Sequence, residues 1–459
     1  MNLYIFIILF IYIYSISIIR LPFNRTIPTS VHITPENYKN YIYESNYYTI
    51  INVGSNNQLI PMRLSFNSYQ SFLTISNYSG NFIKYDPDKS TTYQKTYGER
   101  YFSFINILKG MNSKEKFTLK DIDNKEISCN NINFILATVP NVNISGEFGM
   151  CPSTKDEQYN QLFDYNFILN LYNNNYIKHK IFSINFFNKN SGEILIGDRP
   201  SEYSNYDKDT FVEKNIPIDK NGYFWGLLEL RTSLNGKTLY IKDQTAKFAI
   251  ESYVIKPHVN YKDRIDELFF NEKIKSNKCI FVNESIEYSF YHCDKDIDLT
   301  NFPTLSLYQR TFNYTFELNA SDLFEDFEDR KYFLMNFVEE DDVTSSIWIL
   351  GQPFLKKYKF TYNFDARTVG MYFGMIEEEK QENEEKENKE NEFNKFWIIL
   401  IICSVIIITL GIIIYILIRK IPRKKRANEL EENFDYNGNI NTNDNNNVNN
   451  NENGLGINN

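Results

Sequence analysis

The chain has 459 residues, a formal net charge of −9 at pH 7, and a composition that is 42% hydrophobic and 16% aromatic. This length leaves room for two lobes with appendages, and the apolar content excludes wholesale disorder. Binding to nucleic-acid phosphates needs clustered Lys and Arg, so the acidic balance argues against a nucleic-acid partner. The bulk of the chain is therefore predicted to be globular.

Two apolar segments predict how the chain meets a membrane. Residues 1–19 are nearly all apolar up to Arg20, with small Ser15 and Ser17 near the end, which predicts a signal peptide. No basic residue precedes this run, so an uncleaved signal anchor is the alternative. Residues 396–418 are 23 residues without a charge, enough for a helix to cross a hydrocarbon core of about 30 Å.

The flanks of the second segment predict its orientation. Residues 376–395 contain nine Glu and four Lys, which predicts a solvated acidic stalk, with a charged helix as the alternative. Basic residues cluster directly after the span, and the Asn-rich tail, residues 419–459, is predicted to be disordered. The positive-inside rule places this tail in the cytosol. The sequence thus indicates a single-pass type I protein of the secretory pathway or the cell surface.

Glycosylation sequons agree with a luminal or extracellular N-terminal part. Sequons precede the span and none follows it; they lie at Asn24, Asn77, Asn143, Asn283, Asn313 and Asn319. An Asn-rich chain also generates sequons by chance, so the support for this topology is modest.

The cysteines predict disulfides in that compartment. Cys403 lies inside the predicted span and is interpreted as a packing residue. The other four form an even set, and local pairing joins Cys129 to Cys151 and Cys279 to Cys293. Two other pairings are arithmetically possible, and the first pair could also stay reduced.

The globular part is predicted to be mostly β-strand. Short runs of β-branched and aromatic residues, separated by Asn, Asp, Gly and Ser turns, occur at residues 46–53, 60–64, 102–108, 181–187, 194–196, 224–230 and 359–364. The best helical candidate is residues 159–173. An all-β domain of two lobes follows from this pattern.

Several short motifs occur between residues 41 and 375, and their order along the chain is informative. They are Asn46–Gly54 followed by Gln58, Tyr85–Tyr93, Gly146–Gly149, Ile181–Ile184 with Ser191–Gly197, Tyr223–Trp225, the Cys279/Cys293 pair, and Ile347–Gly351 leading to Phe354 and Asn363–Asp365. In this order they resemble the pepsin-like (family A1) aspartic peptidases. The resemblance implies two pseudo-symmetric β lobes with a cleft between them: an N-terminal lobe over residues 41–205 and a C-terminal lobe over 206–375, after a short segment 20–40.

The chemistry of that family needs two aspartates, one on an Asp-Thr-Gly turn of each lobe, that share one proton. Counted from Gly54 and Gln58, the first position is occupied by Ser65. A hydroxyl cannot replace the carboxylate as a base, because its acidity is far from neutral pH and no His lies nearby in sequence. No Asp or Glu occurs anywhere from residue 45 to 85, so no shift of register supplies one.

The second lobe is similarly depleted. Its aspartate position is occupied by Ala249, although a shifted register could bring Asp243 or Glu251 there. One carboxylate would still not make a pair. The hydroxyls Ser68 and Ser252 persist at the fourth position of each turn.

Two more departures concern the flap and the N-terminal segment. Lys109 and Gly110 take the place of the Tyr-Gly at which the family's flap covers substrate, and a solvated hairpin lysine is the alternative interpretation. Residues 20–40 are too few for the family's usual inhibitory pro-segment. Both changes agree with a fold that is kept while its chemistry is lost.

Other chemistries find less support. The four histidines, His32, His179, His258 and His292, show no metal-ligand spacing, and no phosphate loop or Gly-x-Ser-x-Gly elbow occurs. We expect no cofactor and no metal. The sequence predicts a membrane-anchored, inactive pseudopeptidase that binds peptide or protein segments in its cleft. The alternative is an active aspartic endopeptidase with displaced carboxylates.

Overall fold

The computed structural model describes most of the chain between Ile18 and Tyr372. The described residues are 18–25, 38, 45–75, 82–104, 106–138, 144–152, 165–200, 211–219, 222–239, 242–285, 288–337 and 347–372. All belong to one compact unit, residues 1–375, and residues 376–459 form a second unit. The predicted signal peptide up to residue 17, the stalk, span and tail, and the sequons at Asn77 and Asn143 lie outside the described residues. In the described part, no helix has the length and apolar character needed to cross a bilayer.

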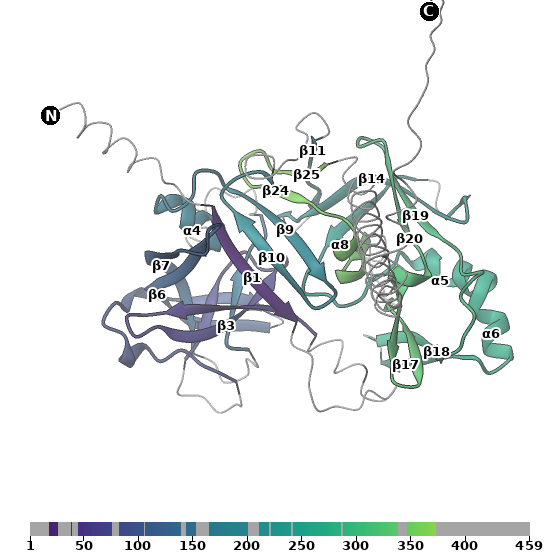
Figure 1. Cartoon of the computed structure of the whole chain (residues 1–459), viewed down its shortest axis with the longest axis horizontal. Helices are drawn as coiled ribbons and strands as arrows, with labels where there is room; N and C mark the ends of the chain where they lie inside the picture. The colour runs from purple at the N-terminus through teal and green to yellow at the C-terminus, as the bar shows by residue number, and fades with distance from the viewer. Residues whose placement is uncertain are drawn as a thin grey trace, which may run out of the picture. The chain divides into compact units, whose positions relative to one another are not determined.

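The described unit is mainly β-strand, as the sequence predicted (Figure 1). Its largest sheet contains, in spatial order, β11 (Phe211–Asn215), β25 (Thr368–Tyr372), β24 (Thr361–Asn363), β9 (Ile181–Asn188), β10 (Ser191–Ile196), β1 (Ile19–Arg25), β2 (Tyr47–Val53), β3 (Gln58–Ser65), β8 (Gly146–Gly149), β4 (Phe72–Thr74), β7 (Glu126–Ala137), β6 (Asn106–Asp121) and β5 (Gln94–Phe104).

The C-terminal half adds smaller sheets. One has the order β20 (Tyr314–Leu318), β19 (Leu305–Gln309), β14 (Gly226–Leu234), β16 (Gln244–Phe248) and β23 (Ile347–Leu350), with β15 (Lys237–Thr238) beside β14. Another has the order β17 (Cys279–Ser285), β18 (Tyr288–Asp294), β22 (Arg330–Phe333) and β21 (Phe324–Phe327). A two-stranded ribbon pairs β12 (Ile218–Asp219) with β13 (Gly222–Tyr223).

Helices are few and short among the described residues. They are the 3-10 turn η1 (Pro87–Lys89), α4 (Phe167–Asn173), α5 (Val259–Ile265), the π-helical η5 (Asp266–Phe270), α6 (Asn271–Lys275), α7 (Ala320–Leu323) and α8 (Gln352–Lys357). The helix predicted over residues 159–173 is described only from Phe167. Its start is set by Asn166, whose side-chain oxygen accepts the N–H groups of Ile168 and Leu169 at 3.0 and 3.2 Å.

Residue alternation explains why the strands form where they do. In β2, Tyr47, Thr49, Ile51 and Val53 are buried, whereas Ile50 between them is exposed. This period of two places one face of the strand in the core. The same logic holds in β1, where every second side chain from Ile19 is buried.

Strand β1 has no counterpart among the sequence-based expectations. It pairs with β10 on one side and β2 on the other, so the predicted N-terminal segment supplies an internal strand of the large sheet. The strand begins at Ile19, the last residue of the predicted signal peptide, and the Ile18 carbonyl accepts the N–H of Ile122 at 3.1 Å. A cleavage that leaves these contacts intact falls before Ile18.

The predicted strand over residues 102–108 is wrong as a single strand. The structure has a hairpin there, in which Phe104 pairs with Asn106 and the chain reverses from β5 into β6. A run of β-formers looks the same from sequence whether it continues or turns back, because both arms are extended.

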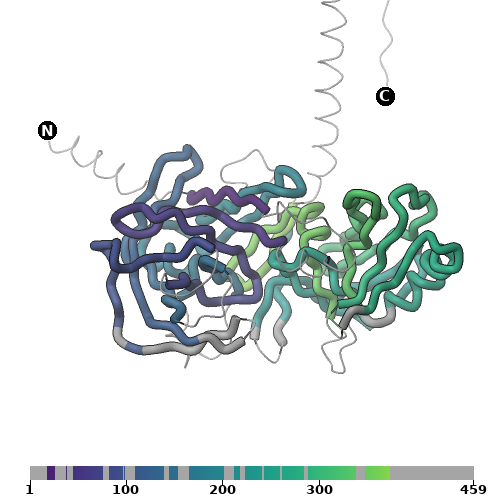
Figure 2. Tube along the Cα trace, turned by 90° about the horizontal axis from the view of Figure 1, so that it is seen from below, coloured from purple at the N-terminus to yellow at the C-terminus, as the bar shows by residue number. Residues whose placement is uncertain are grey.

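The two halves of the unit gather in separate regions, with the purple and blue trace of the first and the green trace of the second on opposite sides (Figure 2). Three strands from the C-terminal half nevertheless belong to the large sheet. β24 pairs with β9, β25 pairs with β24, and β11 closes the edge. The two lobes are therefore joined through continuous backbone hydrogen bonding.

Candidate functional site

The first turn follows strand β3 in the N-terminal lobe. The strand ends at Ser65, which is buried. The Ser65 hydroxyl accepts the backbone N–H groups of Asn67 and Ser68, at 3.3 and 3.1 Å. The side-chain oxygen of Ser65 thus links the strand end to the turn. This role needs a hydrogen-bond acceptor but no acidic group.

The second turn follows strand β16 in the C-terminal lobe. Ala249 is buried, its N–H donates to the carbonyl of Leu350 at 3.1 Å, and its carbonyl accepts the N–H of Ser252 at 3.0 Å. A methyl group offers no acceptor, so only the backbone closes this turn. Asp243 does not reach it: that carboxylate precedes β16 and pairs with Arg231 at 3.1 Å.

Matching hydrogen bonds make the two turns equivalent. The Ser68 hydroxyl donates to the carbonyl two residues later at 2.8 Å, and the Ser252 hydroxyl does the same at 2.8 Å. The Ser68 carbonyl accepts the N–H of Cys151 at 2.9 Å, and the Ser252 carbonyl accepts that of Gln352 at 2.8 Å. Ser68 lies three residues after Ser65, and Ser252 lies three residues after Ala249, so Ser65 and Ala249 occupy corresponding places.

A glycine passes beneath each turn. β8 runs parallel to β3 and ends at Gly149, and β23 runs parallel to β16 and leads into Gly351. A Cβ on Gly149 would come within 2.5 Å of the backbone nitrogen of Gln70, and one on Gly351 within 2.2 Å of the Val254 carbonyl oxygen. Only glycine permits this approach of two backbones.

Glu251 connects the two turns. Its carboxylate oxygen Oε2 accepts the backbone N–H of Phe66, at 3.0 Å, across the lobe boundary. Its other oxygen, Oε1, is buried and has no hydrogen-bond partner among the described residues. Burial, which outweighs the hydrogen bonds that the carboxylate accepts, raises the pKa of Glu251.

Glu147 is a second carboxylate near the first turn, and sequence reasoning missed it. It lies on β8 opposite Arg63 in the parallel register, is fully buried, and accepts from Arg63 Nε at 2.8 Å. Burial raises its pKa against the opposing effect of Arg63, and the charge of Glu251 raises it further. The one signal available in the sequence was a charged residue inside a short motif that otherwise packs as core.

The structure therefore brings two carboxylates, Glu147 and Glu251, into electrostatic contact at the turns, but Glu147 is buried, Glu251 is half-buried, and both are engaged. One is held by Arg63 and the other by the Phe66 N–H. A catalytic pair must instead face a substrate carbonyl and a water. Within the described part of the chain, no group of His, Cys, Asp and Glu has the arrangement of a metal site.

Lys109 does not lie at the tip of the hairpin. The β5–β6 reversal is at residues 104–106, and Lys109 follows on the returning arm, paired with Tyr101. Its carbonyl accepts the N–H of Thr138 at 3.0 Å, so its backbone belongs to the sheet. The residue predicted at the flap position is therefore paired within the β5–β6 hairpin. The register of this hairpin could not be read from the Lys-Gly pair alone.

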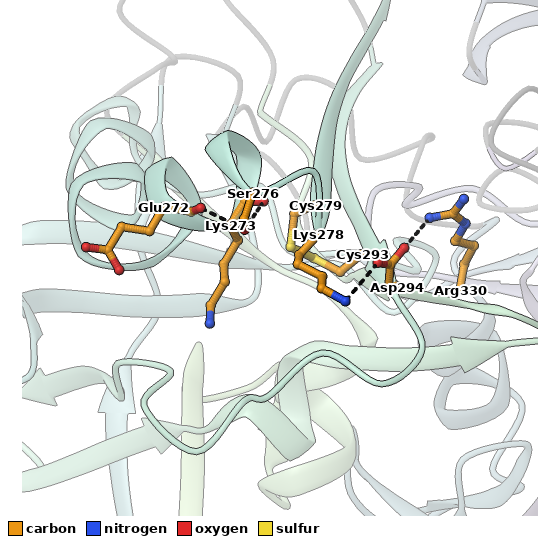
Figure 3. The surroundings of a disulfide bond; sticks show 8 residues. All are labelled: Glu272, Lys273, Ser276, Lys278, Cys279, Cys293, Asp294 and Arg330. Carbon is orange, nitrogen blue, oxygen red and sulfur yellow. Dashed lines mark hydrogen bonds and ion pairs between the residues drawn. A yellow bond between two sulfur atoms is a disulfide. The ribbon is translucent and has the colours of Figure 1, made fainter.

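The cysteines behave differently in the two lobes. Cys279 and Cys293 are directly opposite on β17 and β18 and form the predicted disulfide, flanked by Asp294, which pairs with Arg330 at 2.7 Å (Figure 3). The expected pairing of Cys129 with Cys151 is wrong: both are buried free thiols. Cys129 is on β7 and Cys151 follows β8, and strand β4 lies between those two strands.

Four predicted glycosylation sites can be located on the described surface. Asn24, Asn283, Asn313 and Asn319 are all exposed. Asn319 also accepts from the Thr304 hydroxyl at 2.9 Å, and Asn283 accepts from that of Ser289 at 2.9 Å.

Each lobe has a turn that follows a strand, and a parallel strand ends at a glycine packed against that turn. This arrangement, repeated in both lobes, is the two-lobed fold of the aspartic-peptidase type. The family model of the eukaryotic aspartyl proteases matches residues 46–372, which is more than half of the chain. The chain belongs to this family. A search of curated proteins finds no match.

Proposed function

We propose that this protein is a catalytically inactive member of the aspartyl protease family that binds extended peptide or protein segments between its lobes. The observation that carries the proposal is the pair Ser65 and Ala249 at the two equivalent turn positions. Neither side chain can hold or release the shared proton on which the family's reaction depends.

The alternative, an endopeptidase with displaced carboxylates, draws on Glu147 and Glu251. The raised pKa values of both would suit proton sharing. The burial of Glu147 and the partners of both carboxylates argue against it, since protonating a substrate carbonyl would require Glu147 to leave Arg63 and Glu251 to leave Phe66. We therefore favour a structural role for both.

Assays with unfolded protein separate the two candidates. The full chain in detergent should not cleave unfolded casein between about pH 3 and pH 6 beyond solvent background. Pepstatin-sensitive cleavage that disappears in Glu147→Gln or Glu251→Gln would establish the alternative. The double change Ser65→Asp with Ala249→Asp should give weak or no activity, because Phe66, Asn67 and Ile250 still replace the other turn residues.

Binding has its own test. Peptide segments bound in the extended form are held by main-chain hydrogen bonds. A labelled extended peptide that binds the full chain by fluorescence anisotropy should lose at least tenfold in affinity when alternate amides are N-methylated, because methylation removes the donors and leaves the side chains. Equal binding of both forms would exclude strand-like recognition.

We further propose that the family domain is luminal or extracellular and is anchored by residues 396–418 with the tail in the cytosol. The order of acidic stalk, apolar segment and basic cluster supports this. A C-terminal tag should be digested by protease added to sealed vesicles, while the domain stays protected and glycosylated. A protected tag with unmodified sequons would reverse the topology.

A further inference from the structure

A charged cavity lies away from the two turns, in the C-terminal half of the unit. Its volume is about 550 Å³, and it is lined by parts of α7, α8, β21 and β22 and by Lys189 from the β9–β10 turn. A space of this size accommodates a small organic ligand. We call it the Lys356 pocket, after the residue of α8 discussed next.

The charges that line the pocket are mostly paired with one another. Lys357 forms an ion pair with Asp322 at 2.7 Å, and Lys331 forms one with Asp326 at 2.6 Å. Lys356 has no ion pair or hydrogen bond among the described residues. Lys356 therefore contributes to the pocket lining a cationic side chain without a carboxylate partner among the described residues.

Two more cations stand close to Lys356. Lys189 Nζ and Arg25 Nη1 approach the same oxygen of Glu325, at 3.3 and 3.8 Å. The Arg25 side chain is fully buried. Arg25 and Lys189 thus share one carboxylate, and Lys356 adds a third positive charge beside them.

Two aromatic rings lie near the Lys356 amine. Its Nζ is 5.9 Å from the ring centroid of Tyr47 and 5.8 Å from that of Tyr253, and Arg25 is 4.2 Å from the Tyr253 centroid. Cation–π contacts at such distances are weak compensation for a buried charge. Burial, followed by repulsion from Arg25, lowers the pKa of Lys356 to about 7, with Glu325 opposing and Lys189 adding to the shift.

The other lining residues indicate which kind of anion would neutralise the charge of Lys356. Leu299, Phe324, Leu334 and Pro353 give the pocket an apolar wall. One amine lacks a partner while carboxylates already line the cavity, which favours a single negative charge over a phosphate dianion. We propose that the Lys356 pocket binds a monocarboxylate with an apolar body, its carboxylate on Lys356 Nζ and its body against the apolar wall. This inference does not rest on the proposed function of the turns.

A pair of matched ligands tests the proposal. By isothermal titration calorimetry on the full chain at pH 7, 4-phenylbutyrate should bind at least tenfold more tightly than the neutral 4-phenylbutanol. Lys356→Met should lose tenfold or more in phenylbutyrate affinity. Lys331→Met removes the same charge from the same pocket, but its amine is already paired with Asp326, so it should change affinity by less than about threefold.

Proton uptake provides a readout that a merely structural lysine would not give. The carboxylate needs the protonated amine, so at pH 8 binding should draw close to one proton from buffer, and affinity should fall up to about tenfold per pH unit above 7. The charged groups that face Lys356 are Arg25 from β1, Lys189 from the β9–β10 turn and Glu325 from β21. Lys356→Met should abolish the uptake.

A peptide acid distinguishes the source of the carboxylate. If acetyl-leucyl-phenylalanine binds more tightly than phenylbutyrate, and its amide does not bind, the pocket recognises the C-terminus of a chain; the reverse order assigns it to small acids. Equal binding of phenylbutanol, unchanged affinity in Lys356→Met, or binding without proton uptake would overturn the proposal.

Discussion

The two equivalent turns are closed in different ways. At the first turn, Ser65 keeps a side-chain oxygen that accepts two backbone N–H groups. At the second, Ala249 keeps none, and the neighbouring Glu251 instead extends its carboxylate to the Phe66 N–H of the first turn. The comparison teaches that such a turn can be closed by a side-chain oxygen or by the backbone alone.

Both turns have a glycine packed closely against them, and these two glycines should be the positions most sensitive to mutation. Gly149→Ala and Gly351→Ala each place a Cβ within 2.5 Å of backbone, so each should lower the free energy of unfolding by about 3 kcal/mol or more. Thermal unfolding of the full chain, followed by near-ultraviolet circular dichroism, measures this.

Gly236→Ala is the matched control for those glycines. Gly236 has a φ of +74° but nothing within 4 Å of an added Cβ, so its replacement tests backbone strain alone and should cost about 1 kcal/mol. If all three changes lower the free energy of unfolding equally, close backbone contact at the turns is not the reason for glycine at positions 149 and 351.

The lobes also differ in their cysteines, and this difference has the next largest effect. Replacing Cys279 and Cys293 by Ser opens a loop whose ends are 14 residues apart and should cost roughly 3 kcal/mol. Replacing Cys129 and Cys151 by Ala removes only buried thiols and should cost less.

Thiol mapping checks the same contrast directly. In protein unfolded without reductant, maleimide should label Cys129 and Cys151 and spare the disulfide-bonded Cys279 and Cys293. In folded protein Cys129 should be inert, because burial raises its pKa to about 12. A Cys129–Cys151 disulfide peptide would contradict the structure of the first lobe.

Mutations at Ser65 and Ala249 should have smaller effects on stability, and these effects should differ between the two turns. Ser65→Ala leaves the buried N–H of Ser68 and that of Asn67 without their acceptor and should cost about 1 to 2 kcal/mol. Ala249→Ser adds a hydroxyl where the backbone already closes the turn and should change stability by about 0.5 kcal/mol or less. Equal losses in denaturant titrations would show that Ser65 has no special role.

Sequence reasoning reached the family and the two turns because their signals are local. Strand alternation, short motifs in order and the turn residues Ser65 and Ala249 are all readable within a few residues. The disulfide of β17 and β18 was predictable for the same reason, since both cysteines belong to one hairpin.

The features that sequence missed depend on partners far apart in the chain. Glu147 meets Arg63 across 84 positions only because β8 runs parallel to β3. Cys129 and Cys151 are near in sequence but are separated by β4, whose place between β7 and β8 is a property of the sheet order. The strand β1 was hidden because its apolar start merges with the predicted signal peptide.

The last expected effect concerns Glu251, which joins the two turns. The folded state raises the pKa of Glu251 above its ordinary value, so the folded protein holds this proton more tightly than the unfolded chain does. The contribution of Glu251 to stability is then fully present below about pH 4.5 and is lost as pH rises towards the folded pKa. Glu251→Gln has no such titration but keeps an oxygen for the Phe66 N–H.

The variant and wild type should therefore be similar in stability at pH 4 and diverge as pH rises, with Glu251→Gln the more stable at pH 7. Glu147 titrates in the same direction, and because the charge of Glu251 raises its pKa, the difference between the two proteins reports on both carboxylates together. Glu251→Ala removes the acceptor and should be destabilised at every pH by about 1 to 3 kcal/mol. If Glu251→Gln instead loses stability towards pH 7, the charged carboxylate, rather than its oxygen as an acceptor, joins the two turns.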